Sequence, residues 1–186
     1  TNSLSEGQVL AEPYPYDKAR IIVAEMADSL VFQLTDKNLV TDGLTLDVGY
    51  DRENCDKGSY RGPVHIDHYG RSVPKGAHGS THLGNPTNLG SRIVTAAVEL
   101  FDQIANRSLT VRRITIAANR VVQDEGVYQF DLFSDVEKQE KEKTLQKALL
   151  GIKKKYGKNA VLKGTNFLDG ATMRERNKQI GGHKES

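Results

Sequence analysis

The clearest pattern in the chain is a strict alternation of apolar and polar residues in two segments. In residues 43–50 the apolar positions share one face: Leu44, Leu46, Val48 and Tyr50. In residues 109–122 one face carries Ile114, Ile116 and Ala118, and the other carries Arg113, Thr115 and Ala117. A period of two is typical of strands that bury one face and expose the other, so both segments are predicted to be such strands.

Two weaker segments are also predicted to be strands. Residues 3–9 alternate loosely around Leu4, and Pro13 and Pro15 separate them from the segment that follows. Residues 77–83 are short and polar, which favours a strand at the edge of a sheet.

Two amphipathic helices are predicted between the strands. Residues 17–36 have Asp17 as a candidate N-cap and repeat apolar side chains at helical spacing. The second helix is predicted to open at Asn85-Pro86-Thr87-Asn88, with Thr87 or Asn88 as its cap, and to end near Asn106. The first stripe is Ala19, Ile22, Val23, Met26, Leu30 and Leu34, and the second is Ile93, Ala97, Leu100, Phe101 and Ile104.

The predicted order of elements is β-α-β-β-α-β, which indicates an α+β fold. A four-stranded antiparallel sheet with both helices on one face would bury the two apolar stripes. The other face of such a sheet stays open to solvent. Functional residues are therefore expected on the open face.

The remaining segments are less regular. Residues 51–75 have no sustained period, which predicts a long loop or hairpin. Ser134 and Glu137 form a capping-box pattern, and the charged helix that follows ends at Gly157. Its apolar stripe is Leu145, Leu149, Ile152 and Tyr156. The tail, residues 158–186, is expected to be ordered only where a partner covers it. The chain is thus divided into a domain of residues 1–125 and a C-terminal part, 126–186, that holds a peptide, the charged helix and a basic tail.

Composition narrows the class of protein. The chain has 186 residues, a formal net charge of +2 and one cysteine, Cys55, which leaves no internal disulfide and suits a reducing cytoplasm. No apolar run approaches the roughly 20 residues of a membrane span, so no membrane association is expected. Affinity for nucleic acid would have to come from a local patch, because the net charge is small. Since the chain begins at Thr1 without a methionine, we expect a fragment of a longer protein.

The open face carries residues that suit contact with a phosphate backbone. Arginine, lysine and hydroxyl side chains contact phosphates without reading the base sequence. The strands place Ser3, Ser5, His78, Ser80, Arg113 and Thr115 on that face, with Thr81 as a further candidate. Lys75 and Arg120 would extend the patch, and so would Arg112, whose direction the pattern leaves open by one residue. The alternative is that Arg113 only solubilises an exposed sheet.

A short peptide follows the last predicted strand. It consists of Gln129, Phe130, Asp131, Leu132 and Phe133, and it stands between a turn at 124–126 and the capped helix. The glutamine amide offers a donor and an acceptor, while Leu132 and Phe133 offer two apolar anchors for a pocket on a partner protein. The alternative is a final half-strand with Phe130 and Leu132 packed inward.

Metal binding and catalysis have little support in the sequence. Possible metal ligands gather in one stretch: Cys55, His65, His68, His78 and His82. Their spacing matches no usual zinc pattern, and on a strand His78 and His82 would stand about 13 Å apart, too far to share one ion. There is no Gly-rich phosphate loop or nucleophile elbow, and Asp47 and Asp51 form no convincing pair for two-metal chemistry.

Several segments match a known family. They are Ser3-Leu4-Ser5, Thr45-Leu46-Asp47-Val48-Gly49-Tyr50, Pro86-Thr87-Asn88 and, most clearly, Val111-Arg112-Arg113-Ile114-Thr115-Ile116. With these segments the chain resembles the C-terminal portion of Y-family translesion DNA polymerases of the ImpB/MucB/SamB type. In that family the segment is the little finger, a β-α-β-β-α-β domain whose open sheet lies in the DNA major groove. Residues 129–133 are similar to the family's clamp-binding pentapeptide, and Gln179-Ile180-Gly181-Gly182-His183 resembles the tail of Gram-positive members.

The resemblance implies a function and its partners. It implies a DNA-repair domain that holds primer–template DNA through the open face, contacts an upstream polymerase core and is tethered to the sliding clamp. The family's catalytic carboxylates and their Mg²⁺ belong to an upstream palm domain, so neither catalysis nor a cofactor is expected of this fragment. Residues 51–75 are longer than the family pattern. A protein-interaction module without nucleic-acid binding, or a zinc-stabilised domain, remains an alternative.

Overall fold

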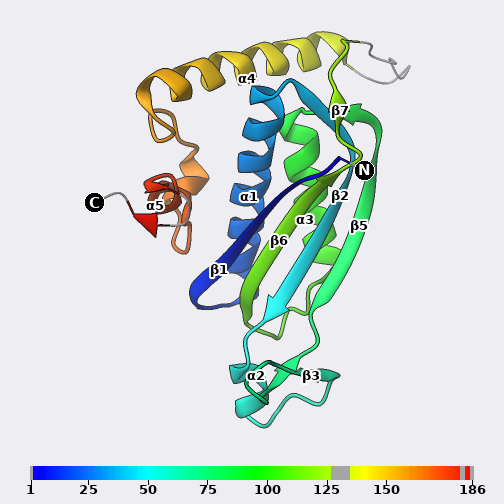
Figure 1. The fold of residues 1–186 in the computed structure, drawn as a ribbon, viewed down its shortest axis with the longest axis vertical. Helices are drawn as coiled ribbons and strands as arrows, with labels where there is room; N and C mark the ends of the chain where they lie inside the picture. The colour runs from blue at the N-terminus through cyan, green and yellow to red at the C-terminus, as the bar shows by residue number, and fades with distance from the viewer. Residues whose placement is uncertain (1, 127–134, 181–182, 185–186) are drawn as a thin grey trace.

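Four long strands form an antiparallel sheet in the order β1-β6-β2-β5 (Figure 1). Their bounds are β1 Leu4–Tyr14, β2 Leu39–Tyr50, β5 Ala77–Thr87 and β6 Val111–Asn119. A two-residue strand, β7 (Val122–Gln123), pairs with the start of β2. The computed structural model describes residues 2–126, 135–180 and 183–184, and within them the predicted α+β fold with its β-α-β-β-α-β order is confirmed.

Two helices cover one face of the sheet, α1 (Tyr16–Asp36) and α3 (Gly90–Ile104) (Figure 1). Their predicted apolar stripes are buried against the inward side chains of the strands, apart from Ile104, which is only partly buried. Ile22, Phe101 and Ile116 have no solvent-accessible surface. Burial of apolar surface contributes about 25 cal/mol per Å². The sheet and the two helices therefore share one core, and the second sheet face is left open.

Both predicted helix starts are wrong. α1 begins at Tyr16, directly after Pro15, so Asp17 lies in the first turn and not at the cap. The first three residues of the segment predicted to open the second helix, Asn85-Pro86-Thr87, belong instead to β5, whose register shifts so that Thr87 pairs with Thr41, and α3 begins only at Gly90. Pro86 has no amide hydrogen to give to a ladder, but β5 is an edge strand, where a proline is tolerated.

Residues 51–76, called the tongue below, connect β2 to β5. They contain α2 (Glu53–Asp56) and a small hairpin of β3 (Val64–Ile66) and β4 (Ser72–Pro74). The base of the tongue is fixed by Asn54, a buried residue whose amide donates to the carbonyls of Asp51 (2.7 Å) and Thr110 (3.0 Å). The Asn54 side-chain oxygen accepts from the Thr110 amide at 3.0 Å. The tongue is thus joined to the residues that lead into β6.

Helix α4 (Val136–Tyr156) packs on the domain through polar side chains. Gln146 Oε1 accepts from the Gly90 amide (2.6 Å) and Glu142 Oε1 from the Ser91 amide (2.7 Å), so α4 caps the start of α3. The predicted apolar stripe is not on the side of α4 that contacts α3, and its residues Leu145, Ile152 and Tyr156 are exposed. The polar side of α4 is the side that meets the amides at the start of α3. Among the described residues, no helix has the length and apolar character needed to cross a membrane.

The residues after α4 fold back along α1 (Figure 1). They include a short helix η1 (Gly164–Phe167), α5 (Met173–Arg176), and the paired β8 (Gln179–Ile180) and β9 (His183–Lys184). Glu25 of α1, a buried carboxylate, accepts from Asn166 Nδ2 (2.9 Å) and from the amides of Thr172 (2.8 Å) and Met173 (3.1 Å). The tail was expected to be ordered only where a partner covers it, and here α1 of the same chain takes that place.

Candidate nucleic-acid interface

The open face is built from rows of residues that pair across the four strands. One row is Val9, Arg113 and Gly49, and the next is Gly7, Thr115, Asp47 and His78. A third row is Ser5, Ala117, Thr45 and Ser80, and a fourth is Asn119, Gly43 and His82. Ser3, directly before β1, is also exposed. Most of these side chains are small, so the face has a low floor on which a few longer side chains stand.

Two arginines lie next to glycines of this floor. A Cβ on Gly49 would come within 3.3 Å of Arg113 Cβ, and a Cβ on Gly43 would come within 2.6 Å of the Arg120 guanidinium. The Arg113 guanidinium makes no hydrogen bond or ion pair with any residue in the described part of the chain. It is therefore a positive charge available to a ligand.

The other charges of the face are partly neutralised. Asp47 Oδ1 lies 2.6 Å from His78 Nδ1, and both side chains are exposed. Asp42 Oδ1 accepts from Arg120 Nε at 2.6 Å, while its other oxygen lies 3.6 Å from His82 Nε2. Arg120 therefore holds an ion pair within the protein and offers a ligand less than Arg113 does. Lys75, next to the lower end of β5, is exposed.

Two of the predicted contact residues lie elsewhere than on this floor. Thr81 pairs with Leu44, whose side chain is buried among the helices, so Thr81 is on the covered side of the sheet. Arg112 is an extra residue of a bulge, since Val111 pairs with Tyr50 and Arg113 with Gly49. Its Nη1 donates to the Ala11 carbonyl (3.1 Å) and its Nε lies 3.8 Å from Asp51. Arg112 thus ties β1 to the base of the tongue.

The predicted docking peptide, residues 129–133, lies outside the described residues, but both of its flanks are fixed. The Asp124 amide donates to the Asn38 carbonyl (2.9 Å), and Lys143 of α4 bonds the Asp124 carboxylate (2.5 Å). Burial opposes ionisation of Asp124, but Lys143 and the Gly126 amide outweigh it and hold the pKa of Asp124 below its ordinary value. On the other side, Asp135 caps α4 by accepting from the Lys138 amide.

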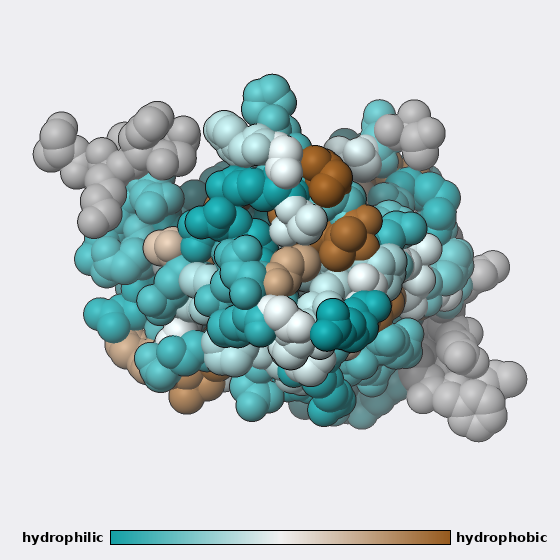
Figure 2. All heavy atoms as spheres, turned by 90° about the horizontal axis from the view of Figure 1, so that it is seen from below, coloured by the Kyte–Doolittle hydropathy of each residue, from teal (hydrophilic) through white to brown (hydrophobic). Residues whose placement is uncertain are grey.

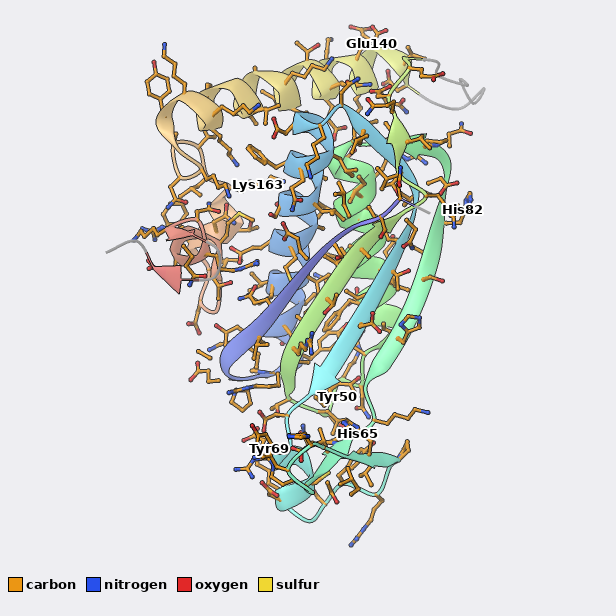
Figure 3. All side chains as sticks on the ribbon, viewed as in Figure 1. Tyr50, His65, Tyr69, His82, Glu140 and Lys163 are labelled. Carbon is orange, nitrogen blue, oxygen red and sulfur yellow. The ribbon has the colours of Figure 1, made fainter. Side chains whose placement is uncertain are left out.

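The candidate metal ligands divide between two places. His65 belongs to the tongue and His82 to the far end of β5, as their positions in Figure 3 make clear. Within the described residues, no three His, Cys, Asp or Glu side chains are grouped so that they could hold a metal ion.

Sequence reasoning missed one feature of this surface. His82 stands on the open face with His78 and Ser80, and continuing the alternation by two residues beyond Ser80 would have found it. Residues 51–75 were predicted to be a long loop or hairpin, and they contain the hairpin of β3 and β4, whose strands of three residues are too short to show a period.

Comparisons with known proteins place the chain in a family. The sequence model of the "impB/mucB/samB family C-terminal domain" matches residues 1–132. "DNA polymerase IV 2" of Halalkalibacterium halodurans is 28% identical over 111 residues, which are 60% of this chain and 26% of that protein. "Putative UV-damage repair protein UvrX" of Bacillus subtilis is 23% identical over 183 residues, 98% of this chain and 39% of that protein. The chain therefore spans well under half the length of these relatives.

A solved structure, "Complex of beta-clamp processivity factor and little finger domain of PolIV", aligns with a TM-score of 0.42 and 11% identity, covering 72% of this chain and 100% of that one. The family assignment rests on the sequence match, which extends from the first residue through all the strands of the main sheet. The resemblance inferred from the sequence is confirmed: the chain belongs to the impB/mucB/samB family, and its residues 1–132 match the C-terminal domain of that family.

Proposed function

We propose that the open face binds the sugar–phosphate backbones of duplex DNA, as the DNA-holding domain of a longer translesion polymerase. The observation that carries this proposal is Arg113, a guanidinium without a described partner on a floor of small residues. The hydroxyls of Ser3, Ser5, Ser80 and Thr115 and the cation of Lys75 flank it. Membership of the family supports the same assignment.

The chemistry of the face favours contact without base readout. Base edges are read by bidentate arginine, asparagine or glutamine side chains that reach into a groove. On this floor the Asn119 amide is engaged by Thr45 at 2.6 Å and Arg120 by Asp42, which leaves mainly hydroxyls and Arg113. Such groups bind phosphates of any sequence. Binding of this kind suits a polymerase that copies damaged templates.

The test is the salt dependence of duplex binding, measured by fluorescence anisotropy for the chain and for Arg113→Ala. Losing one phosphate contact should weaken binding about equally for unrelated sequences and lower the salt slope by about one unit. Arg174→Ala is the matched control, because Arg174 is an exposed arginine on α5, away from the open face.

Unchanged affinity and slope in Arg113→Ala would exclude the open face as the DNA site. No duplex binding by the unaltered chain would favour the alternative, a face that packs on a partner protein. Val9, an exposed aliphatic side chain beside Arg113, is the feature that would suit such a partner.

We also propose that residues 129–133 dock on the sliding clamp. Support comes from the peptide itself, Gln129 followed by Leu132 and Phe133, and from the anchoring of its two flanks at Asp124 and Asp135. A pocket on the clamp would bind the side chains of Leu132 and Phe133, and the peptide would connect the clamp to one edge of the domain.

Titration of purified clamp with the chain, by calorimetry, tests the docking proposal. Replacing Leu132 and Phe133 by alanine together should weaken binding at least 10-fold, since hot-spot side chains contribute about 2 kcal/mol or more each. The control replaces Leu145 and Ile152 of α4, which are exposed apolar residues outside the peptide. Equal affinity of the peptide variant and the unaltered chain would rule out this docking mode.

Polymerase activity is proposed only for a longer protein that contains this domain and a catalytic core. Two-metal phosphoryl transfer needs clustered carboxylates, and the described residues contain no such cluster. Any Mg²⁺ would accordingly serve the catalytic core, and we assign no cofactor to these 186 residues.

A further inference from the structure

The tongue exposes an unusual group of apolar and aromatic side chains. Tyr69, Ile66 and Val64 are 77%, 62% and 48% exposed. Seen from this end of the molecule, apolar side chains form a small island within a hydrophilic surface (Figure 2). Exposed aromatic and aliphatic residues grouped on a projecting hairpin contribute nothing to the core, so they are suited to a ligand.

The tip is held in one shape. Asp67 Oδ1 accepts from the amides of Tyr69 and Arg71, both at 2.9 Å, and Gly70 closes the turn with a φ of 75°. The Arg71 guanidinium bonds the other Asp67 oxygen (2.7 Å) and lies 4.7 Å from the centre of the Tyr69 ring. Hydrogen bonds from Arg71 lower the pKa of Asp67 to about 2. The Tyr69 ring is thus supported on one side by a cation and presented to solvent.

The tongue has more exposed cations than exposed acids, although Lys57 pairs with Glu53 and Arg71 with Asp67. The exposed cations of the tongue are Arg52, Lys57, Arg61, Arg71 and Lys75, while Asp56 is its one exposed acidic residue. The other three acidic side chains accept hydrogen bonds within the protein. Asp51 accepts from the Glu53 amide, Glu53 accepts from Thr110 Oγ1, and Asp67 holds the turn. Proteins that bind single-stranded nucleic acid commonly combine aromatic rings, on which bases stack, with cationic side chains that contact the phosphates.

The tongue continues the open face. It leaves β2 just after Gly49, which pairs with Arg113, and it returns through Lys75 to β5 and His78. Figure 3 places Tyr69 beyond the end of the sheet, along the direction of the strands. A duplex that runs along the strands of the open face would have the tongue at one of its ends.

We propose that the tongue binds unpaired bases that extend from the duplex, by stacking on Tyr69 while its cations contact the adjoining phosphates. This inference rests on the proposed binding of duplex DNA to the open face. Stacking needs a base whose flat surface is accessible, and a base inside the duplex has both surfaces covered by its neighbours. An aromatic platform at the end of a duplex-binding surface therefore selects the single-stranded overhang.

The experiment compares a blunt duplex with the same duplex bearing a single-stranded overhang, by anisotropy, for the chain and its variants. Base–aromatic stacking contributes about 1–3 kcal/mol per base, which is about 5- to 150-fold in affinity. The chain should bind the overhang substrate more tightly by that factor. Tyr69→Ala should lose the factor and keep its affinity for blunt duplex, while Tyr69→Phe should retain both. Tyr156→Ala, which removes another exposed tyrosine, should change neither.

A spectroscopic readout uses the absence of tryptophan from the sequence. Tyr69→Trp introduces a single indole, whose emission should be quenched by the overhang substrate and unaffected by blunt duplex. Tyr156→Trp should respond to neither. This measurement reports stacking directly, whatever the affinity.

The outcomes separate the two proposals. If the chain binds blunt duplex but shows no gain in affinity from the overhang and no quenching at position 69, the proposed tongue contact is refuted. The proposed binding of duplex to the open face would still stand. An equal loss for both substrates in Tyr69→Ala would also refute it, because the tongue would then contact the duplex itself. No binding of either DNA would refute duplex binding and the tongue contact together, and would leave the apolar tip to a protein partner.

Discussion

Replacing Glu25 by alanine would remove the acceptor on which the C-terminal segment is held. Glu25 lies on α1 with only 3% of its surface exposed. Its two carboxylate oxygens receive three hydrogen bonds, from Asn166 Nδ2 and from the amides that begin α5 at Thr172 and Met173. Around this point two ion pairs, Lys18–Asp169 and Lys163–Asp28, join the same segment to α1, and in each pair the partner from the segment is exposed.

The size of the effect follows from the kind of bond. A hydrogen bond to a charged group contributes about 1.5–3 kcal/mol, whereas an exposed ion pair contributes about 0–1 kcal/mol. The three donors would regain water when the segment detaches, so the loss is smaller than the sum of three bonds. We expect Glu25→Ala to reduce the free energy of docking of residues 163–173 by about 2–4 kcal/mol. Glu25→Gln should fall between, because its amide keeps one acceptor oxygen but turns a donor towards other donors.

Hydrogen exchange measures this docking directly. In Glu25→Ala the amides of Thr172 and Met173 should exchange about 30- to 1000-fold faster, while those of β2 and β6 should be less affected. Glu99→Ala serves as control, because Glu99 is an exposed carboxylate on α3. Exchange at Thr172 and Met173 that matches the unaltered chain would show that the carboxylate does not hold the segment.

Three further predictions concern other parts of the domain. Asn54→Ala leaves the Thr110 amide without its acceptor, while the carbonyls of Asp51 and Thr110 keep only their backbone donors. It should lower the free energy of unfolding by about 1–3 kcal/mol in urea denaturation, and a loss below 0.5 kcal/mol would contradict this role. The folded-state pKa of Asp67, about 2, is below its ordinary 3.8, so the turn should be complete at neutral pH and be lost as the pH falls through about 2. Nuclear magnetic resonance of the Arg71 amide would follow this loss, and a midpoint near 3.8 would contradict it. Leu145→Ala should change stability by less than about 0.5 kcal/mol, because Leu145 is exposed; a larger loss in thermal unfolding would mean that it is covered.

The sheet and its two helices were predictable because their patterns are long. Alternation over residues 43–50 and 109–122 identifies which side chains face the core, and the structure buries Leu46, Ile114 and Ile116 accordingly. Helix α4 was not predictable in the same way. The helix has an apolar stripe, but which of its sides docks depends on the surface that it meets. That surface carries the amides at the start of α3, and they donate hydrogen bonds to Glu142 and Gln146.

The candidate site was predictable to the level of a face, but not of every residue. Ser5, Ser80 and Arg113 follow from alternation, whereas the bulge at Arg112 and the pairing of Arg120 with Asp42 depend on register, which a single sequence does not reveal. The contacts by which Glu25 holds the last residues join positions more than 140 apart in the chain, and no local pattern indicates them.

The low floor of the open face has a consequence for movement. Glycine, serine, alanine and threonine make up most of this surface, and Arg113 is a long cation on it without a described partner. A duplex lying there would meet few features that fix it in one register, because each phosphate resembles the next. A duplex that advances by one base pair would then exchange one set of phosphate contacts for an equivalent set, at little cost in free energy. The domain would therefore stay bound while the duplex moves along its surface.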